Sequence, residues 1–230
     1  FIISLVLVFR INTAYDRWYE GRKLWGGLVN NCRNLAIRLS AIVPGTEAST
    51  RTTVSQLIAA FPVTLKEHLR SKKADEQITF NEILGRNEFA AATHQPNHIS
   101  VKLSAFCLEI CNRHKKTEND YLVISENLGA LIDIAGGCER IRSTPIPYSY
   151  SIFIKKVIFL YIVTMPVTFG MTIGYWSVPI VIIMFYAFAS LELISEEIED
   201  PFGTDANDLP TDEIASRIGA NVKEILNVNE

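Results

Sequence analysis

Two long uncharged runs in the second half of the chain dominate its hydrophobic pattern. The first extends from Val157 to Ile173 and the second from Ser177 to Leu191, with Gly174-Tyr175-Trp176 between them. A helix of about 20 apolar residues spans the hydrocarbon core of a bilayer. The two runs therefore predict a pair of membrane helices within residues 151–195, joined by a tight turn. The alternative is a buried helical hairpin in the core of a soluble protein.

The chain also begins with an apolar segment, FIISLVLVF, which is followed by Arg10. This segment is shorter than a membrane span, so we expect residues 1–14 to be the end of a membrane helix that starts outside the given sequence. Phe1, Leu5 and Phe9 recur every four residues and therefore share one helix face. Such a stripe is typical of packing against lipid or a protein core. Several copies of the helix around an axis would instead stack the three side chains into an apolar constriction.

Residues 15–150 have the pattern of amphipathic helices and little strand character. In the first of these helices, apolar residues step by three or four along one face until Pro44-Gly45 ends the helix. This face comprises Leu24, Leu28, Cys32, Leu35, Leu39 and Ile42. Further helices are expected over residues 53–70, 101–114 and 120–134, with a loop around Gln95-Pro96-Asn97 and a helix end at Gly136-Gly137. Within residues 196–230, one more helix is predicted by Ile214, Ile218, Val222 and Ile225.

Composition and charge favour a membrane protein. Hydrophobic residues make up 48% of the chain and the mean hydropathy is +0.17, which is high for a soluble protein of this size. The net charge of -3 provides no basic surface that would argue for nucleic acid. Arg10 and Arg17 follow the first apolar segment and Lys155-Lys156 precede the second, whereas the turn at residues 172–177 carries no charge. By the positive-inside rule, we expect an integral protein of the cell (inner) membrane with both termini cytoplasmic.

Catalytic motifs are scarce in this sequence. It contains no GxxxxGK[ST], HExxH or GxSxG pattern, so nothing supports an enzyme. Cys107, Cys111 and His114 fall on one face of a predicted helix, where they could present three ligands to zinc. A buried stripe of small residues that ends in a histidine is the commoner arrangement. We therefore predict no catalytic site, no structural metal at these residues and no required cofactor.

Three longer blocks of sequence resemble the bestrophin ion-channel family, and its bacterial members in particular. They are FRINTAYDRWYEGRKLWGGLVN, GGCERIRSTPIPYSY and EEIEDPFGTDANDLP, and their order and spacing fit over essentially the whole chain. The resemblance implies an all-α homopentamer around one central pore, with membrane helices, a large helical cytosolic body and both termini in the cytosol. The family has a further membrane helix upstream, which the given sequence lacks.

The resemblance also implies positions for the narrow parts of the pore. The family's neck of three apolar rings matches Phe1, Leu5 and Phe9. Its second, cytosolic constriction falls at Asn119, where relatives usually have an apolar residue. Either this aperture is polar and less restrictive, or Tyr121 or Leu122 takes the role.

An acidic segment broken by a proline follows the last apolar run. In animal bestrophins the matching segment is a clasp that holds calcium, and the resemblance places the clasp at Glu197, Asp200, Asp205 and Asp208. These carboxylates could supply part of the roughly six to eight oxygens that calcium takes. Alternatively, Asp200 and either Asp208 or Thr211 cap helix ends while the other acids stay solvated. We expect this structural role, and a channel whose activity is not strictly calcium-dependent.

The predicted function is a passive pentameric channel for monovalent ions, with chloride-like anions favoured. Its expected partners are further copies of the chain, membrane lipids and the conducted ions. A sodium or potassium channel of the same fold is one alternative. A helical membrane scaffold or regulatory protein without conduction is a second, and a membrane-bound enzyme is a third. Ion flux into liposomes and reversal potentials separate these possibilities.

Overall fold

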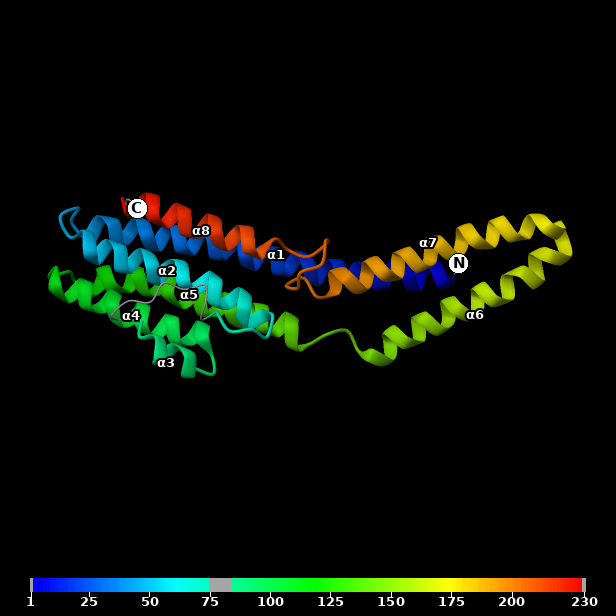
Figure 1. Ribbon diagram of the computed structural model, residues 1–230, viewed down its shortest axis with the longest axis horizontal. Coiled ribbons are helices and arrows are strands. Elements are labelled where there is room, and N and C mark those ends of the chain that lie inside the picture. Colours follow the sequence, from blue (N-terminus) through cyan, green and yellow to red (C-terminus); the bar gives the residue numbers. More distant parts are fainter. Residues whose placement is uncertain (1, 75–83, 229–230) are drawn as a thin grey trace. The chain divides into compact units, whose positions relative to one another are not determined.

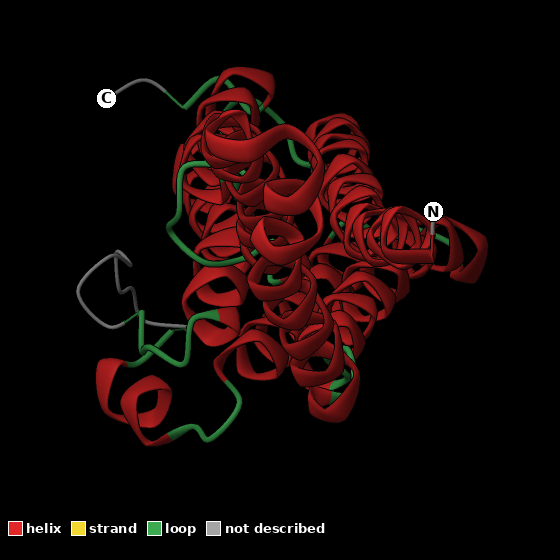
Figure 2. Ribbon diagram, turned by 90° about the vertical axis from the view of Figure 1, so that its right-hand side faces the viewer, coloured by secondary structure: helices red, strands yellow, loops and turns green. Residues whose placement is uncertain are grey.

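The computed structural model describes residues 2–74 and 84–228, and within them it contains helices and loops but no strand (Figure 2). The predicted all-α fold is therefore confirmed. The chain divides into two compact units. The first, called the membrane unit below, consists of Phe1–Gly21 and Ile141–Leu209. The second, called the helical body, consists of Arg22–Arg140 and Pro210–Glu230.

Figure 1 shows the described helices in chain order. In chain order they are α1 (Ile2–Ile42), α2 (Ala48–Leu69), α3 (Arg86–Ala91), α4 (Gln95–Arg113), α5 (Glu118–Ser143), α6 (Tyr148–Ile173), the 3-10 helix η1 (Gly174–Trp176), α7 (Ser177–Glu199) and α8 (Thr211–Ile225). The apolar start of the chain and the first predicted amphipathic helix are thus one continuous helix, α1.

In the membrane unit, α6 and α7 pack against each other and are connected by η1. Gly174 has a positive φ of 60° at this turn, a conformation that glycine adopts without steric cost. Leu7 of α1 packs into a small core with Ile154, Ile158 and Phe188. By length and composition, the stretch Tyr148–Glu199 can cross a membrane, since its most apolar window has a mean hydropathy of 2.1. Only 17% of that window is buried, which argues against a hairpin in a soluble core.

In the helical body, α2 packs against both α4 and α8. The predicted apolar face of α8 is confirmed, because Ile214, Ile218 and Val222 are buried on one side of the helix. Asp212 in the first turn of α8 forms ion pairs with Lys66 at 2.6 Å and Arg70 at 2.8 Å, both on or just after α2. Apolar burial and these ion pairs together hold α8 on α2.

Three predicted helix boundaries are wrong, one of them because α2 begins at Ala48 rather than at residue 53. Gln95-Pro96-Asn97 forms the first turn of α4 rather than a loop, because proline is tolerated where helical N–H groups have no partner. His94 caps this turn by accepting a hydrogen bond from the Asn97 N–H at 3.1 Å. The third error is at Gly136-Gly137, through which α5 continues to Ser143. A Cβ atom on Gly137 would lie 3.0 Å from Leu24 of α1, so this glycine permits close helix packing.

Candidate functional site

The predicted neck lies on α1 in the membrane unit. Phe1 is outside the described residues, but Leu5 and Phe9 are 45% and 58% exposed. Leu7, on the other side of the helix, is only 2% exposed because it packs into the core with α6 and α7. Large apolar side chains that their own unit leaves uncovered meet lipid, another protein surface or a pore. The structure therefore places Leu5 and Phe9 on an outer face of the unit.

Polar residues continue this face of α1 after Phe9. Asn12, Thr13 and Asp16 are all exposed and follow Phe9 at spacings that keep them on the same side of the helix. The Thr13 hydroxyl donates a hydrogen bond to the Phe9 carbonyl oxygen at 2.9 Å. Because polar side chains in contact with lipid hydrocarbon are costly, this change of character favours contact with water from Asn12 onward.

Arg10 follows the neck residues directly, but its side chain points into the membrane unit and is 1% exposed. Its Nη2 lies 2.8 Å from Glu199 Oε2, and its Nε lies 3.9 Å from Glu192 Oε2. The other carboxylate oxygen of Glu199 accepts a hydrogen bond from the Ile146 N–H at 2.8 Å. Arg10 is thus the buried partner of two acidic side chains of α7. In the sequence it is also the basic residue that flanks the first apolar segment. The network connects α1, the end of α7 and the segment before α6.

Arg17, two turns further along α1, binds the C-terminal ends of two helices. Its guanidinium donates to the carbonyl oxygens of Glu199 at 3.0 Å, Thr144 at 2.5 Å and Ile141 at 2.5 Å. Glu199 ends α7, while the other two carbonyls lie in and just after the last turn of α5. Carbonyl groups at these places have no partner within the helix, and the helix dipole favours a positive charge beside them. Arg17 therefore fixes α1 to two helix ends.

The loop after α7 folds against α1. Phe202 is 1% exposed, and a Cβ atom on Gly21 would lie 3.2 Å from its ring and 3.3 Å from Leu209. Trp18 donates a hydrogen bond from Nε1 to the Asn207 carbonyl oxygen at 3.0 Å. Apolar contacts and this hydrogen bond thus anchor the acidic loop on the helix that carries the neck residues.

The acidic side chains of this loop act as hydrogen-bond acceptors. Glu197 accepts from Asn207 Nδ2 at 2.6 Å, and Asp208 accepts from the Asp205 N–H at 2.7 Å. Asp200 is the exposed C-cap residue of α7. The prediction that Asp208 or Thr211 caps the following helix is wrong. The N-cap of α8 is Pro210, without a side-chain hydrogen bond, whereas Asp208 caps the turn of its own loop.

Neither of the two candidate metal-ligand sets considered from the sequence forms a compact group. In residues 2–74 and 84–228, the one set of three metal-binding side chains with converging ligand atoms is His68, His94 and Glu139. The four candidate clasp acids, Glu197, Asp200, Asp205 and Asp208, form no such group among the described residues, nor do Cys107, Cys111 and His114. Burial raises the pKa of the Cys107 thiol to about 12, which disfavours the thiolate that a zinc ion needs. His114 instead lies 3.3 Å from Glu47 Oε1.

The candidate aperture residues lie at the start of α5 in the helical body. Asn119 is exposed in the first turn of the helix. Tyr121 faces α4, where its hydroxyl lies 3.3 Å from Ser104 Oγ, whereas Leu122 is 58% exposed. Of the three, Asn119 and Leu122 are therefore the residues whose side chains extend from the surface of the body.

Fold and site together define a helical membrane protein in which a helix with an uncovered apolar face is fastened by buried ion pairs and by contacts with an acidic loop. The sequence profile of the family described as "Bacterial/Fungal Bestrophin protein" matches residues 1–224. The chain therefore belongs to the bacterial and fungal bestrophin family, as the three sequence blocks predict.

Similar proteins in this family have been described as channels. A voltage-dependent anion channel-forming protein from Synechocystis is 34% identical over 98% of this chain and 75% of its own length. The protein YneE of Escherichia coli (strain K12), which has the same description, is 32% identical over 94% of this chain and 71% of its own length. A crystal structure of a bacterial bestrophin homologue from Klebsiella pneumoniae matches 100% of this chain and 85% of that chain, with a TM-score of 0.92 and 27% identity.

Proposed function

We propose that the chain is one subunit of a passive ion channel that favours anions. The observation that carries this proposal is the uncovered apolar stripe of Leu5 and Phe9, followed on the same face of α1 by polar side chains. Copies of the stripe around a common axis would form a neck of apolar rings, with Phe1 as a further ring. Similarity to voltage-dependent anion channel-forming proteins supports both conduction and the preference for anions.

The proposed assembly is a homopentamer in the cell (inner) membrane, with both termini cytoplasmic. The exposed apolar side chains of α6 and α7 support insertion in lipid, because Phe159, Met171 and Tyr186 are each more than two-thirds exposed. Charged residues support the orientation. Lys155 and Glu196 lie at the end of the α6 and α7 pair that is opposite to the uncharged turn, η1.

The same proposal places the pore's cytosolic constriction at Asn119. A ring of amide side chains would restrict ions less than a ring of large apolar side chains, because amides replace part of the ion's hydration shell. Leu122 is the alternative, since its exposed side chain would form an apolar ring. Asn119→Leu and Leu122→Asn variants separate the two, because only the exchange at the true aperture changes the conductance.

The acidic loop is proposed to have a structural role, with calcium neither required for assembly nor strictly required for activity. Hydrogen bonds to Glu197 Oε2 and Asp208 Oδ2 support this role, because they use these oxygens as acceptors for groups of the loop itself. Currents recorded while free calcium is changed from chelated to millimolar test the proposal. A steep activation by calcium that is lost in Asp205→Ala or Asp208→Ala would contradict it.

The full-length protein in liposomes tests channel function and selectivity together. We expect chloride flux, and a reversal potential in asymmetric potassium chloride that moves toward the chloride equilibrium potential. A shift toward the potassium equilibrium potential would instead support a cation channel of the same fold. No flux from protein that light scattering shows to be a folded oligomer would support a membrane scaffold.

A further inference from the structure

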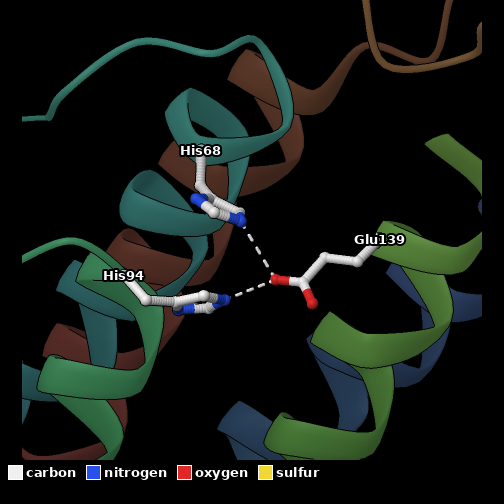
Figure 3. Close-up of side chains that lie close together, drawn as sticks. All are labelled: His68, His94 and Glu139. Carbon is white, nitrogen blue, oxygen red and sulfur yellow. Dashed lines mark hydrogen bonds and ion pairs between the residues drawn. The ribbon is translucent and has the colours of Figure 1, made fainter. Parts of the chain in front are cut away.

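Two histidines and a glutamate from three different helices meet in the helical body (Figure 3). His68 lies in the last turn of α2, His94 is the N-cap residue of α4, and Glu139 lies in α5. Glu139 Oε1 is 3.0 Å from His68 Nε2 and 2.6 Å from His94 Nε2. The two imidazole rings lie with their centroids 4.3 Å apart. None of these residues belongs to the neck, the aperture or the acidic loop.

We propose that this cluster binds a divalent transition-metal ion, with zinc as the ion that fits its donors best. Two imidazole nitrogens and one carboxylate oxygen are a donor set that zinc takes, whereas calcium and magnesium take oxygen ligands. The three ligand atoms all lie within 4.8 Å of one another, so one ion with bonds of about 2.0–2.2 Å reaches them after small side-chain movements.

The surroundings of the cluster also suit a metal ion. The side chains of His68, His94 and Glu139 are 27%, 29% and 36% exposed, so an ion enters from solvent and keeps one position for water. The backbone that carries them is held by helix packing: α2 packs on α4, and Gly137 brings α5 close to α1. Bound zinc would therefore cross-link three helices that are already near one another.

A hydrogen bond at His94 offers a way to distinguish a bound metal ion from a cluster that is held by hydrogen bonds alone. Its Nδ1 accepts from the Asn97 N–H, so in the metal-free protein the ring proton is on Nε2, which donates to Glu139. A neutral imidazole with a metal on Nε2 carries its proton on Nδ1. Zinc binding therefore removes the acceptor of the Asn97 N–H, and we expect hydrogen exchange of this amide to become faster when zinc is added.

Binding is measured by titrating the full-length, detergent-solubilised protein, stripped with a chelator, with Co²⁺ and then displacing the cobalt with Zn²⁺. We expect one ion per chain and the visible absorption of tetrahedral cobalt. Each of two variants removes one ligand but keeps a hydrogen-bonding role of the residue that it replaces. His94→Asn retains a good N-cap acceptor, and Glu139→Gln retains an oxygen that accepts from both imidazoles. Each is expected to bind at least about 100-fold more weakly, because loss of outer-shell partners alone costs about 10–100-fold.

His114→Gln provides the matched control, because it changes another histidine that faces a glutamate without a third ligand. Its metal affinity is expected to equal that of the unchanged protein. The proposal is overturned by the absence of saturable binding at one ion per chain. It is also overturned if the His94→Asn and Glu139→Gln proteins, with unchanged circular dichroism, bind the metal ion as tightly as the unchanged protein does. Loss of binding in His114→Gln would overturn it as well.

Discussion

Replacing Arg10 with methionine is expected to destabilise the protein by about 3–5 kcal/mol. The side chain is 1% exposed and lies 2.8 Å from a carboxylate oxygen of Glu199 and 3.9 Å from one of Glu192. Methionine keeps much of the buried volume but removes the positive charge. The two acidic side chains, 15% and 8% exposed, would then remain in the interior without their counter-charge. Breaking a buried ion pair from one side costs this much because the remaining charge is poorly hydrated.

This loss is large enough to measure by thermal unfolding of the detergent-solubilised protein, followed by tryptophan fluorescence. For a chain of 230 residues, 1 kcal/mol corresponds to about 2–4 °C in Tm, so we expect a decrease of about 6–20 °C. Lys155→Met is the matched control. It breaks an ion pair with Glu196 at 2.8 Å whose side chains are 47% and 55% exposed. Exposed pairs contribute about 0–1 kcal/mol, so its Tm should change by no more than about 4 °C.

A double variant separates loss of charge from loss of packing. Glu199→Gln in the Arg10→Met background removes one uncompensated charge and retains an oxygen that can accept from the Ile146 N–H. We expect this second change to recover part of the lost stability, because contacting residues couple by about 0.5–3 kcal/mol. If Arg10→Met and Lys155→Met have the same Tm, or if Glu199→Gln lowers the Tm further, then the buried ion pair does not hold α1 in place.

Three further perturbations test other parts of the structure. Alanine at both Leu5 and Phe9 should raise single-channel conductance in planar bilayers, because it widens the apolar neck; unchanged conductance would indicate that these side chains face lipid. Gly21→Ala should destabilise by about 1–3 kcal/mol, since its Cβ would lie 3.2 Å from an aromatic ring of the acidic loop. Gly26→Ala, where the nearest atom is 3.8 Å away, should be neutral or stabilising by up to about 1 kcal/mol, and equal Tm values would refute the steric argument. A hydrogen bond from Arg70, just after α2, lowers the pKa of Asp212 to about 2. Its contribution to stability is therefore present above the ordinary carboxyl pKa of about 4 and is lost as the pH falls toward 2. Asp212→Asn should therefore flatten the dependence of Tm on pH between these values, and parallel curves would contradict this assignment.

The helices could be predicted from the sequence where burial repeats along one face. In α8 the residues Ile214, Ile218 and Val222 are buried at intervals of four, and the helix forms where that pattern lies. The long apolar runs of α6 and α7 were equally clear, because a helix in a membrane exposes apolar side chains on every side. In both cases the signal is local, since it depends only on spacing within one helix.

Predicted helix boundaries were wrong at a glycine and a proline, residue types that often end a helix but have another role here. Gly137 resembles a helix end in sequence, but it lies inside α5 because Leu24 of α1 leaves no room for a larger residue. Pro96 resembles a loop residue, but it occupies the first turn of α4, where its missing N–H is not needed. The position of Leu24 explains the first case, and a single-sequence pattern does not contain it. The second case was local, because proline is common in the first turn of a helix.

The buried polar contacts of the site were beyond prediction for the same reason. An arginine after an apolar run, such as Arg10, is typical of a basic membrane flank, and its acidic partners on α7 are far away in sequence. His68, His94 and Glu139 likewise come from three helices, and no spacing rule connects them. By contrast, helical periodicity already places Leu5 and Phe9 on one face of their helix, although only the structure shows that this face is exposed.

Acidic side chains at the end of α7 and in the loop after it accept hydrogen bonds from N–H groups of that loop. The chain turns at Pro201. Backbone N–H groups in this turn have no carbonyl oxygen of a regular helix or sheet as their acceptor. Asp208 accepts one of these from Asp205, and Glu197 accepts from Asn207, the residue whose carbonyl is bound by Trp18. A calcium ion would have to compete with these bonds at Asp208 Oδ2 and Glu197 Oε2. Because these bonds and the packing of Phe202 against Gly21 anchor the loop on α1, we expect the loop to hold its shape, and the neck helix its position, without calcium.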